Sequence, residues 1–175
     1  LYGAGFSPDQ ILEIIQSTDI TGLFRLGLPV KGGIIDTEKF SGLLHNYTGS
    51  LDVSELPIPV MVLCEDLKTK RQVRLAEGDF LTVMKAAYAL PVYFNPVEFK
   101  DHLLIDGGIA NLVPLDTAYD YFETVIASTA FYQNPNLNLR NPVTNINVAL
   151  DIGKSRTGVS QIKEYDPILI RCNVE

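Results

Sequence analysis

The chain has 175 residues, and 46% of them are hydrophobic, which is enough for one domain with a sizeable core. Its 14 basic and 21 acidic residues give a net charge of −7, and no run of Lys or Arg is long enough to form a basic stripe. This balance argues against nucleic acid and strongly anionic membranes as electrostatic partners, and no apolar stretch approaches the roughly 20 residues that a membrane-spanning helix needs.

Two helices are predicted in the first third of the chain. Residues 1–6 read as the tail of a helix that a glycine stops. The sequence Ser7-Pro8-Asp9-Gln10 then supplies an N-cap, a proline at the first helical position and a glutamine three residues after the cap, so we expect a helix to begin there. Residues 27–33 are predicted to form a loop, and Asp36 is predicted to cap a second helix that ends at about Asn46.

The central part of the chain is predicted to contain four strands and a helix. Val60–Cys64 is a continuous apolar run of strand length that we expect to be buried on both faces, and Gln72–Leu75 is its exposed hairpin partner. Asp79 opens a helix that ends before the next proline. Two further strands, which deliver Asp106, are predicted at Val97–Phe99 and His102–Ile105.

The remaining elements alternate between helix and strand. Pro114 opens a short helix, and Thr124–Ser128 is predicted to be a buried strand. They are followed by a loop over 133–142, a helix over 143–162 and a strand over 167–172. This alternation of apolar strands with helices predicts a three-layer α/β/α domain with a mostly parallel sheet.

The strongest chemical signal is Asp106, which follows an apolar strand and precedes Gly107 and Gly108. Two glycines let the backbone turn sharply, and an aspartate that leaves a buried strand is desolvated and rigidly held, which suits a general base. The alternative interpretation is an ordinary turn, in which Asp and Gly merely supply turn chemistry. On this tetrapeptide alone, the turn is the better supported reading.

Other chemical signatures are absent or incomplete. Gly153-Lys154-Ser155 resembles the end of a phosphate loop, but the glycine that this motif requires is replaced by Val148. No G-x-S-x-G nucleophile elbow occurs anywhere in the chain. Neither His45 nor His102 has a metal-ligand spacing, so no metal or other cofactor is expected.

The two cysteines, Cys64 and Cys172, lie in apolar runs without a C-x-x-C spacing. We predict that both are reduced core residues rather than metal ligands or a disulfide, because clustered or regularly spaced cysteines mark the other two uses. This usage favours a reducing compartment. We therefore expect a cytoplasmic protein, with peripheral membrane association left open.

An ordered series of motifs favours the interpretation of Asp106 as a general base over that of an ordinary turn residue. Lys85–Val97 contains A-x-A-x-P-x-x-F-x-P, and Leu104–Pro114 contains D-G-G-x-x-N-x-x-P after two apolar residues. Leu56–Val60 reads L-P-I-P-V, and Glu65–Thr69 reads E-D-L-K-T. In this order the segments resemble the patatin-like phospholipase family, and the resemblance covers essentially all of residues 1–175, with Leu1–Phe6 similar to the end of the helix that follows that family's nucleophile elbow.

The resemblance implies a lipid acyl hydrolase, a phospholipase or esterase, that uses a Ser-Asp dyad without histidine. Asp106 would be the dyad aspartate and general base, with Gly107, Gly108 and Asn111 forming the loop beside it. It also implies a single patatin-like domain over residues 1–175 that lacks the amino-terminal strands, with the serine and the oxyanion loop upstream. Asn111 would fix the loop through hydrogen bonds, although a simple turn asparagine is equally compatible with the sequence.

The sequence departs from the family pattern at two positions, and a second hypothesis for its function stands beside the lipid acyl hydrolase. Ala87 stands where the family usually has serine, and Leu112 where it often has a second asparagine. Tyr88, Tyr93 and Phe94 are candidates for an acyl pocket, with core packing as the favoured alternative. The second hypothesis is a degenerate, noncatalytic relative that binds lipid or a protein partner.

The partners that these hypotheses predict are a lipid or other acyl-ester substrate and, transiently, a membrane or micelle surface, with no nucleic acid. A domain without its central strands exposes sheet edges and apolar surface. We therefore also predict self-association of the chain.

Overall fold

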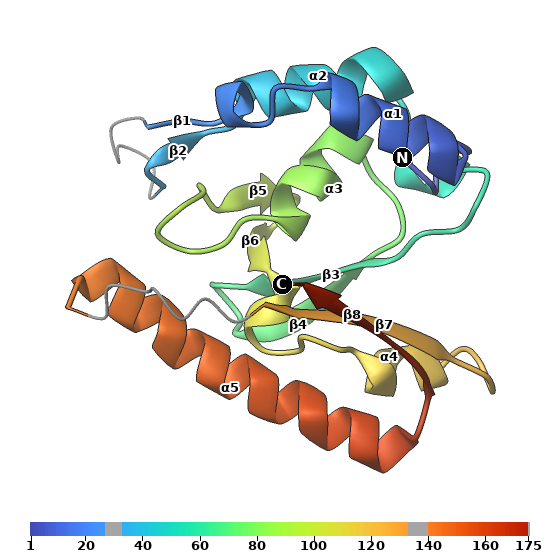
Figure 1. Ribbon diagram of the computed structural model, residues 1–175, viewed down its shortest axis with the longest axis vertical. Coiled ribbons are helices and arrows are strands. Elements are labelled where there is room, and N and C mark those ends of the chain that lie inside the picture. The colour runs from blue at the N-terminus through green and yellow to red at the C-terminus, as the bar shows by residue number, and fades with distance from the viewer. Residues whose placement is uncertain (27–32, 133–139, 175) are drawn as a thin grey trace. The chain divides into compact units, whose positions relative to one another are not determined.

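The computed structural model describes residues 1–26, 33–132 and 140–174, and it divides into two compact units, Leu1–Gly107 and Gly108–Glu175 (Figure 1). Among the described helices, none is both long and apolar enough to cross a membrane.

The first unit contains three α-helices and six strands among its described residues. Its helices are α1 (Pro8–Ser17), α2 (Glu38–Thr48) and α3 (Phe80–Ala87), with 3₁₀ turns at Thr21–Leu23 and Val53–Glu55. Its strands are β1 (Arg25–Leu26), β2 (Ile35–Asp36), β3 (Val62–Asp66), β4 (Arg71–Leu75), β5 (Val97–Phe99) and β6 (His102–Asp106). Residues 1–6 form a hydrogen-bonded turn in which Gly5 has a φ of 91°.

The predicted start of α1 is confirmed in detail. The Ser7 N–H donates to Gln10 Oε1 over 2.8 Å, and the Gln10 N–H donates to Ser7 Oγ over 3.3 Å, which is a capping box. The second predicted helix is present but is shifted. It begins at Glu38, whose N–H donates to Asp36 Oδ1 over 2.8 Å, and it ends at Thr48 because Gly49 takes a φ of 65°.

The main sheet of the first unit is a four-stranded antiparallel sheet with the strand order β4-β3-β6-β5. Both outer strands are hairpin partners of the strand beside them, with Lys70 in the β3–β4 turn at a φ of 57°. The central pair, β3 and β6, aligns Cys64 with Asp106 and Asp66 with Leu104. The sheet therefore places the end of β6 beside the middle of β3.

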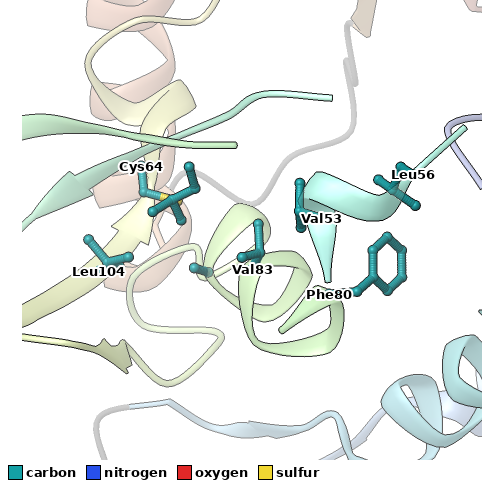
Figure 2. Packing of buried hydrophobic residues seen from close by; sticks show 8 residues of the cluster. Val53, Leu56, Cys64, Phe80, Val83 and Leu104 are labelled. Atoms are coloured by element: carbon teal, nitrogen blue, oxygen red, sulfur yellow. The ribbon is translucent and has the colours of Figure 1, made fainter. Parts of the chain in front are cut away.

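The core of the first unit lies between α3 and this sheet. Val83 and Ala86 of α3 are fully buried, as are Cys64 of β3 and Leu104 of β6. Figure 2 shows Cys64 and Leu104 on the strand side of this cluster and Val83 on the helix side. The cluster continues through Val53, Leu56, Leu75 and Phe80. A fully buried Val, Leu or Phe side chain stabilises the fold by about 1.5–3 kcal/mol relative to the same side chain exposed to water.

The second unit is a β-α-β arrangement with one extra short helix. Its elements are α4 (Leu115–Tyr119), β7 (Ile126–Tyr132), α5 (Pro142–Tyr165) and β8 (Ile168–Val174). Strands β7 and β8 pair in parallel, because the crossover through α5 returns the chain to the same end of the sheet. Buried Val113, Leu115 and Ala127 form its core, against which Ile162, Tyr165 and Leu169 pack.

The predicted α/β class is confirmed, but the prediction of a mostly parallel sheet is wrong for the described residues. Among the strands in the described part of the chain, only β7 and β8 pair in parallel, whereas the four-stranded sheet is built from two hairpins joined through β3 and β6 and is antiparallel throughout. The short connections within the hairpins leave no room for the crossovers that parallel neighbours require.

Three finer predictions also need correction. The strand predicted over Thr124–Ser128 begins at Ile126 and is not buried on both faces, since Ile126 is 63% exposed. Cys172 is exposed rather than in the core. The strand predicted over Val60–Cys64 runs from Val62 to Asp66, and most of it is only half-buried. Most of the loops predicted over 27–33 and 133–142 lies outside the described residues, which resume at Gly33 and at Arg140.

Candidate active site

Asp106 is the last residue of β6 and is half-buried. Its backbone N–H donates to the carbonyl of Ala89 over 3.2 Å, just beyond the end of α3. Across the sheet its register partner is Cys64 of β3. The backbone that carries the carboxylate is thus held from the neighbouring strand and from the segment after α3, and Asp106 stands at the strand end, as the sequence predicts.

The environment of Cys64 indicates how apolar the sheet is beside Asp106. Burial raises the pKa of the Cys64 thiol to about 12, and the carboxylates of Asp106 and Glu65 act in the same direction. Burial also raises the pKa of Glu65. A negative charge is therefore disfavoured on Cys64, the partner of Asp106 across the sheet, and on Glu65, the partner of Ile105, and Cys64 is unsuited to serve as a nucleophile.

Gly107 is required by the close approach of two backbones. A side-chain carbon on this residue would overlap the carbonyl oxygen of Leu63 on β3 and would crowd the N–H of Cys64. The chain passes directly from Asp106 into a 3₁₀ turn over Gly107–Ile109. The first glycine of the motif thus fixes how closely the end of β6 lies against β3.

The other end of β6 is anchored by Asp66, a residue that the sequence analysis did not assign to the site. Asp66 is 1% exposed, and His102 Nδ1 lies 2.9 Å from its Oδ2. The N–H of Leu103 donates to its Oδ1 over 3.0 Å. The β3–β4 turn adds two more donors, the Thr69 hydroxyl at 2.7 Å and the Lys68 N–H at 3.1 Å. One buried carboxylate thus joins that turn to the first residues of β6.

The electrostatics of this anchor follow from its hydrogen bonds. The bond with His102 is the largest cause that holds the pKa of the Asp66 carboxyl well below its usual range, and its backbone and hydroxyl donors add to it against the effect of burial. The E-D-L-K-T segment contained a signal for this role, since an aspartate followed by a turn often accepts from the N–H two residues later. Its contacts with β6 required the fold.

The four predicted site residues are divided between the two units. Asp106 and Gly107 end the first unit, and Gly108 and Asn111 open the second. Asn111 makes two side-chain hydrogen bonds: its Nδ2 donates to Asp116 Oδ1 over 2.9 Å, and its Oδ1 accepts from Gln161 Nε2 over 2.9 Å. Asn111 therefore does more than occupy a turn, because it is tied to α4 and to α5.

Two of the three aromatic candidates for an acyl pocket, Tyr88 and Phe94, are packed against other aromatic rings. Tyr88 lies with its ring centroid 5.3 Å from that of Phe40 and 5.5 Å from that of Phe94. Phe24 completes the cluster, 5.5 Å from Phe40 and 6.1 Å from Phe94. Ring distances of this size are typical of core packing. These contacts therefore support core packing of Tyr88 and Phe94, which is the interpretation that the sequence favoured.

An open groove of about 380 Å³ lies in the second unit. It follows six consecutive residues of the chain, Val125–Ala130, and its other wall is formed by Leu112–Leu115 and Ala118. None of the predicted site residues lines it. Within residues 1–26, 33–132 and 140–174, no group of three His, Cys, Asp or Glu side chains is placed to hold a metal ion.

The sequence of the first unit and the start of the second matches a known family model. The model for patatin-like phospholipase matches residues 2–119, which include β6, the glycine turn and Asn111. The chain belongs to the patatin-like phospholipase family. The family match ends with α4, so β7, α5 and β8 lie beyond the matched residues.

Curated relatives agree with this assignment. The chain is 30% identical over 83 residues to an uncharacterized NTE family protein of Mycobacterium bovis, and to proteins of the same description from two strains of Mycobacterium tuberculosis. The aligned part is 47% of this chain and 23% of each relative. The chain thus covers about a quarter of the length of these relatives.

Proposed function

We propose that this chain carries the general base of a lipid acyl hydrolase, a serine-type carboxylic-ester hydrolase in which Asp106 pairs with a serine. The main support is the position of Asp106 at the end of β6, within the residues that the patatin-like phospholipase model matches. Since no G-x-S-x-G stands in the 175 residues, the serine of this dyad is supplied by a part of the protein outside them.

The proposed reaction needs one base and one nucleophile. The Asp106 carboxylate takes the proton of the serine hydroxyl as the serine oxygen attacks the ester carbonyl carbon. The tetrahedral intermediate then expels the alcohol, which receives that proton from Asp106, and an acyl-serine remains. Water repeats the sequence with Asp106 as base, and this releases the carboxylic acid and restores the serine.

The proposed substrate is a lipid or another acyl ester, met at a membrane or micelle surface. The support for this class is family membership. Asp106 would act without an intervening histidine, so its carboxylate must itself reach the serine hydroxyl. The backbone contacts of Asp106 with Ala89 and of Gly107 with Leu63 support such a role, because they limit its freedom to turn away.

The test compares three forms of the longest natural gene product that contains this chain: the parent, Asp106→Asn and Asp101→Asn. Asp101 is an exposed residue of the β5–β6 hairpin and undergoes the same change of charge, so it is the matched control. Each form is assayed on a short-chain p-nitrophenyl ester and on phospholipid vesicles. We expect Asp106→Asn to lower kcat by about 10²–10⁴-fold, as for loss of a general base, and Asp101→Asn to retain activity.

The outcome decides between the two hypotheses for this family member. Equal activity of Asp106→Asn and the parent would remove Asp106 from the mechanism. A parent without turnover on either substrate would favour a noncatalytic relative that binds lipid or protein. Circular dichroism of each variant shows whether the fold is retained before activities are compared.

A further inference from the structure

Gln161, on α5, makes three hydrogen bonds to the segment that follows the glycine turn. Its Oε1 accepts from the N–H of Leu115 over 2.7 Å and from the N–H of Asp116 over 3.2 Å. Its Nε2 donates to Asn111 Oδ1 over 2.9 Å. The orientation of the amide is fixed by these partners, because its oxygen faces two donors and its nitrogen faces an acceptor.

These bonds supply a cap that α4 lacks. The N-cap position of α4 is Pro114, which makes no side-chain hydrogen bond to the helix. The first N–H groups of a helix have no partner within it, and a buried one without any partner is costly. Leu115 is only 2% exposed, and its N–H donates to the carbonyl of Val113 over 2.8 Å and also to Gln161 Oε1, 46 residues later in the chain.

The position of Gln161 is itself fixed by the packing of α5. Gly158, one turn earlier, is buried, and a side-chain carbon there would lie 3.3 Å from Cγ2 of Val113. Tyr165, one turn later, stacks on Tyr119 of α4 with ring centroids 5.3 Å apart. Residues three and four apart share a helix face, so Gly158, Gln161 and Tyr165 together hold α5 against residues 112–119.

We propose that Gln161 is a positioning residue for Asn111, the asparagine of the candidate site loop. Asn111 lies five residues after Asp106, and Gln161 ties its side chain to α5 while it caps α4. The inference rests on the proposed role of Asp106 as base. It also gives a function to α5, which lies outside the residues that the family model matches.

The three hydrogen bonds of Gln161 to Leu115, Asp116 and Asn111, called the lock below, are tested first. This test uses the 175-residue chain and needs no assay of activity. Gln161→Met keeps the length of the side chain and removes all three hydrogen bonds. We expect amide hydrogen exchange at Leu115 and Asp116 to become about tenfold faster, as for one net hydrogen bond each, while exchange at Leu103 in the first unit is unchanged. Ser160→Ala, at the neighbouring exposed position, is the control and should leave all these rates unchanged.

A second variant separates the two halves of the lock. Gln161→Glu keeps an acceptor for the N–H groups of Leu115 and Asp116 but cannot donate to Asn111 Oδ1. We expect it to retain slow exchange at those two amides. If positioning acts through Asn111, both Gln161 variants lower kcat by about tenfold or more in the longest natural product, with KM within about twofold of the parent.

Each result supports or overturns the proposal. Unchanged exchange at Leu115 and Asp116 in Gln161→Met would show that the lock does not exist in solution. Faster exchange with an unchanged kcat would make Gln161 purely structural, and a fall of kcat in Gln161→Met alone would assign the effect to the cap and overturn the route through Asn111. If the parent has no turnover, or Asp106→Asn equals it, the proposed function fails and the positioning role fails with it, whereas the exchange experiment still reports the lock.

Discussion

In the first unit, eight buried side chains join α3 and a 3₁₀ turn to a four-stranded antiparallel sheet, whereas in the second unit three buried side chains lie between α4, α5 and a two-stranded parallel sheet. These counts refer to the described residues. A two-stranded sheet is marginal by itself and depends on the helices that cover it. The exposed faces differ as well, because Ile126, Ile168 and Ile170 are 63%, 57% and 50% exposed on the side of β7 and β8 opposite the core.

This difference indicates two ways of holding a candidate site residue. Asp106 stands on a strand with a partner on each side and a helix packed over the sheet. Asn111 stands on a loop whose position depends on side-chain hydrogen bonds to α4 and α5. Packing should therefore govern the stability around Asp106, and specific polar contacts should govern the order around Asn111.

The largest expected effect is the loss of a buried leucine from each core. Leu104→Ala, in the first unit, is expected to lower the free energy of unfolding by about 3–4 kcal/mol, and Leu115→Ala, in the second, by about 2–3 kcal/mol, because a smaller core leaves less packing to lose. Leu104 is 0% and Leu115 2% exposed, so the sites are matched in burial. Urea unfolding followed by hydrogen exchange in each unit measures both values. Equal losses would contradict the comparison of the cores.

The second expected effect is the loss of stability of the first unit at low pH. Since the pKa of Asp66 is lowered in the fold, its unfolded form, with a pKa of about 3.9, binds a proton first as the pH falls. The stabilisation by Asp66 is therefore complete above that value and is lost as the pH falls through the lower, folded one. Asp66→Asn should lower the urea midpoint at pH 7 and make it less sensitive to acid. Asp101→Asn is the control, and a parallel acid response in Asp66→Asn and the parent would assign it to other carboxylates.

Self-association of the chain should come from the second unit. Replacement of Ile126, Ile168 and Ile170 by threonine keeps residues suited to strands and removes most of the exposed apolar surface of that sheet face. We expect light scattering to show a smaller mean mass for this variant than for the parent. Leu12→Gln with Ile15→Gln removes exposed apolar surface from α1 instead and should have the smaller effect. The reverse order would place the association surface in the first unit.

The smallest predicted effects are at two helix N-caps, one in each unit. Asn141 Oδ1 accepts from the N–H groups of Val143 and Thr144 at the start of α5, and Asp79 Oδ2 accepts from Thr82 at the start of α3. Substitution of either cap by alanine is expected to cost about 1 kcal/mol. Hydrogen exchange should localise each loss to its own unit. A loss that spread over both units would show that they unfold together.

Much of the fold was predictable because its signals are local. The capping box of α1, the β3–β4 hairpin, α3 with Asp79 as its cap and the start of α4 all follow from residues close in the sequence. The pairing of β3 with β6 does not, since it joins segments about 40 residues apart through register and burial. The alternating order of elements suggested parallel pairing, and this was wrong where hairpins decide the sheet.

The same limit applies to the candidate site. Asp106 and the glycines after it form a compact motif, and the close approach of Gly107 to Leu63 supplies a physical reason for one of them. Asp66 and Gln161 lie far from that motif in the sequence, and their contacts with the start of β6 and with Asn111 appear only in the fold. A glutamine near the end of a long helix, such as Gln161 in α5, has no sequence feature that distinguishes it from a solvent-exposed one.

The different exposure of the two cysteine thiols allows the opening of the first unit to be followed by thiol labelling. Cys172 is exposed on β8, whereas Cys64 is 0% exposed under α3 and is held as the neutral thiol. A maleimide or iodoacetamide should therefore label Cys172 in the folded protein and reach Cys64 only when the first unit opens. Mass spectrometry of labelled peptides then times that opening with no added reporter, and it does so in the unmodified sequence.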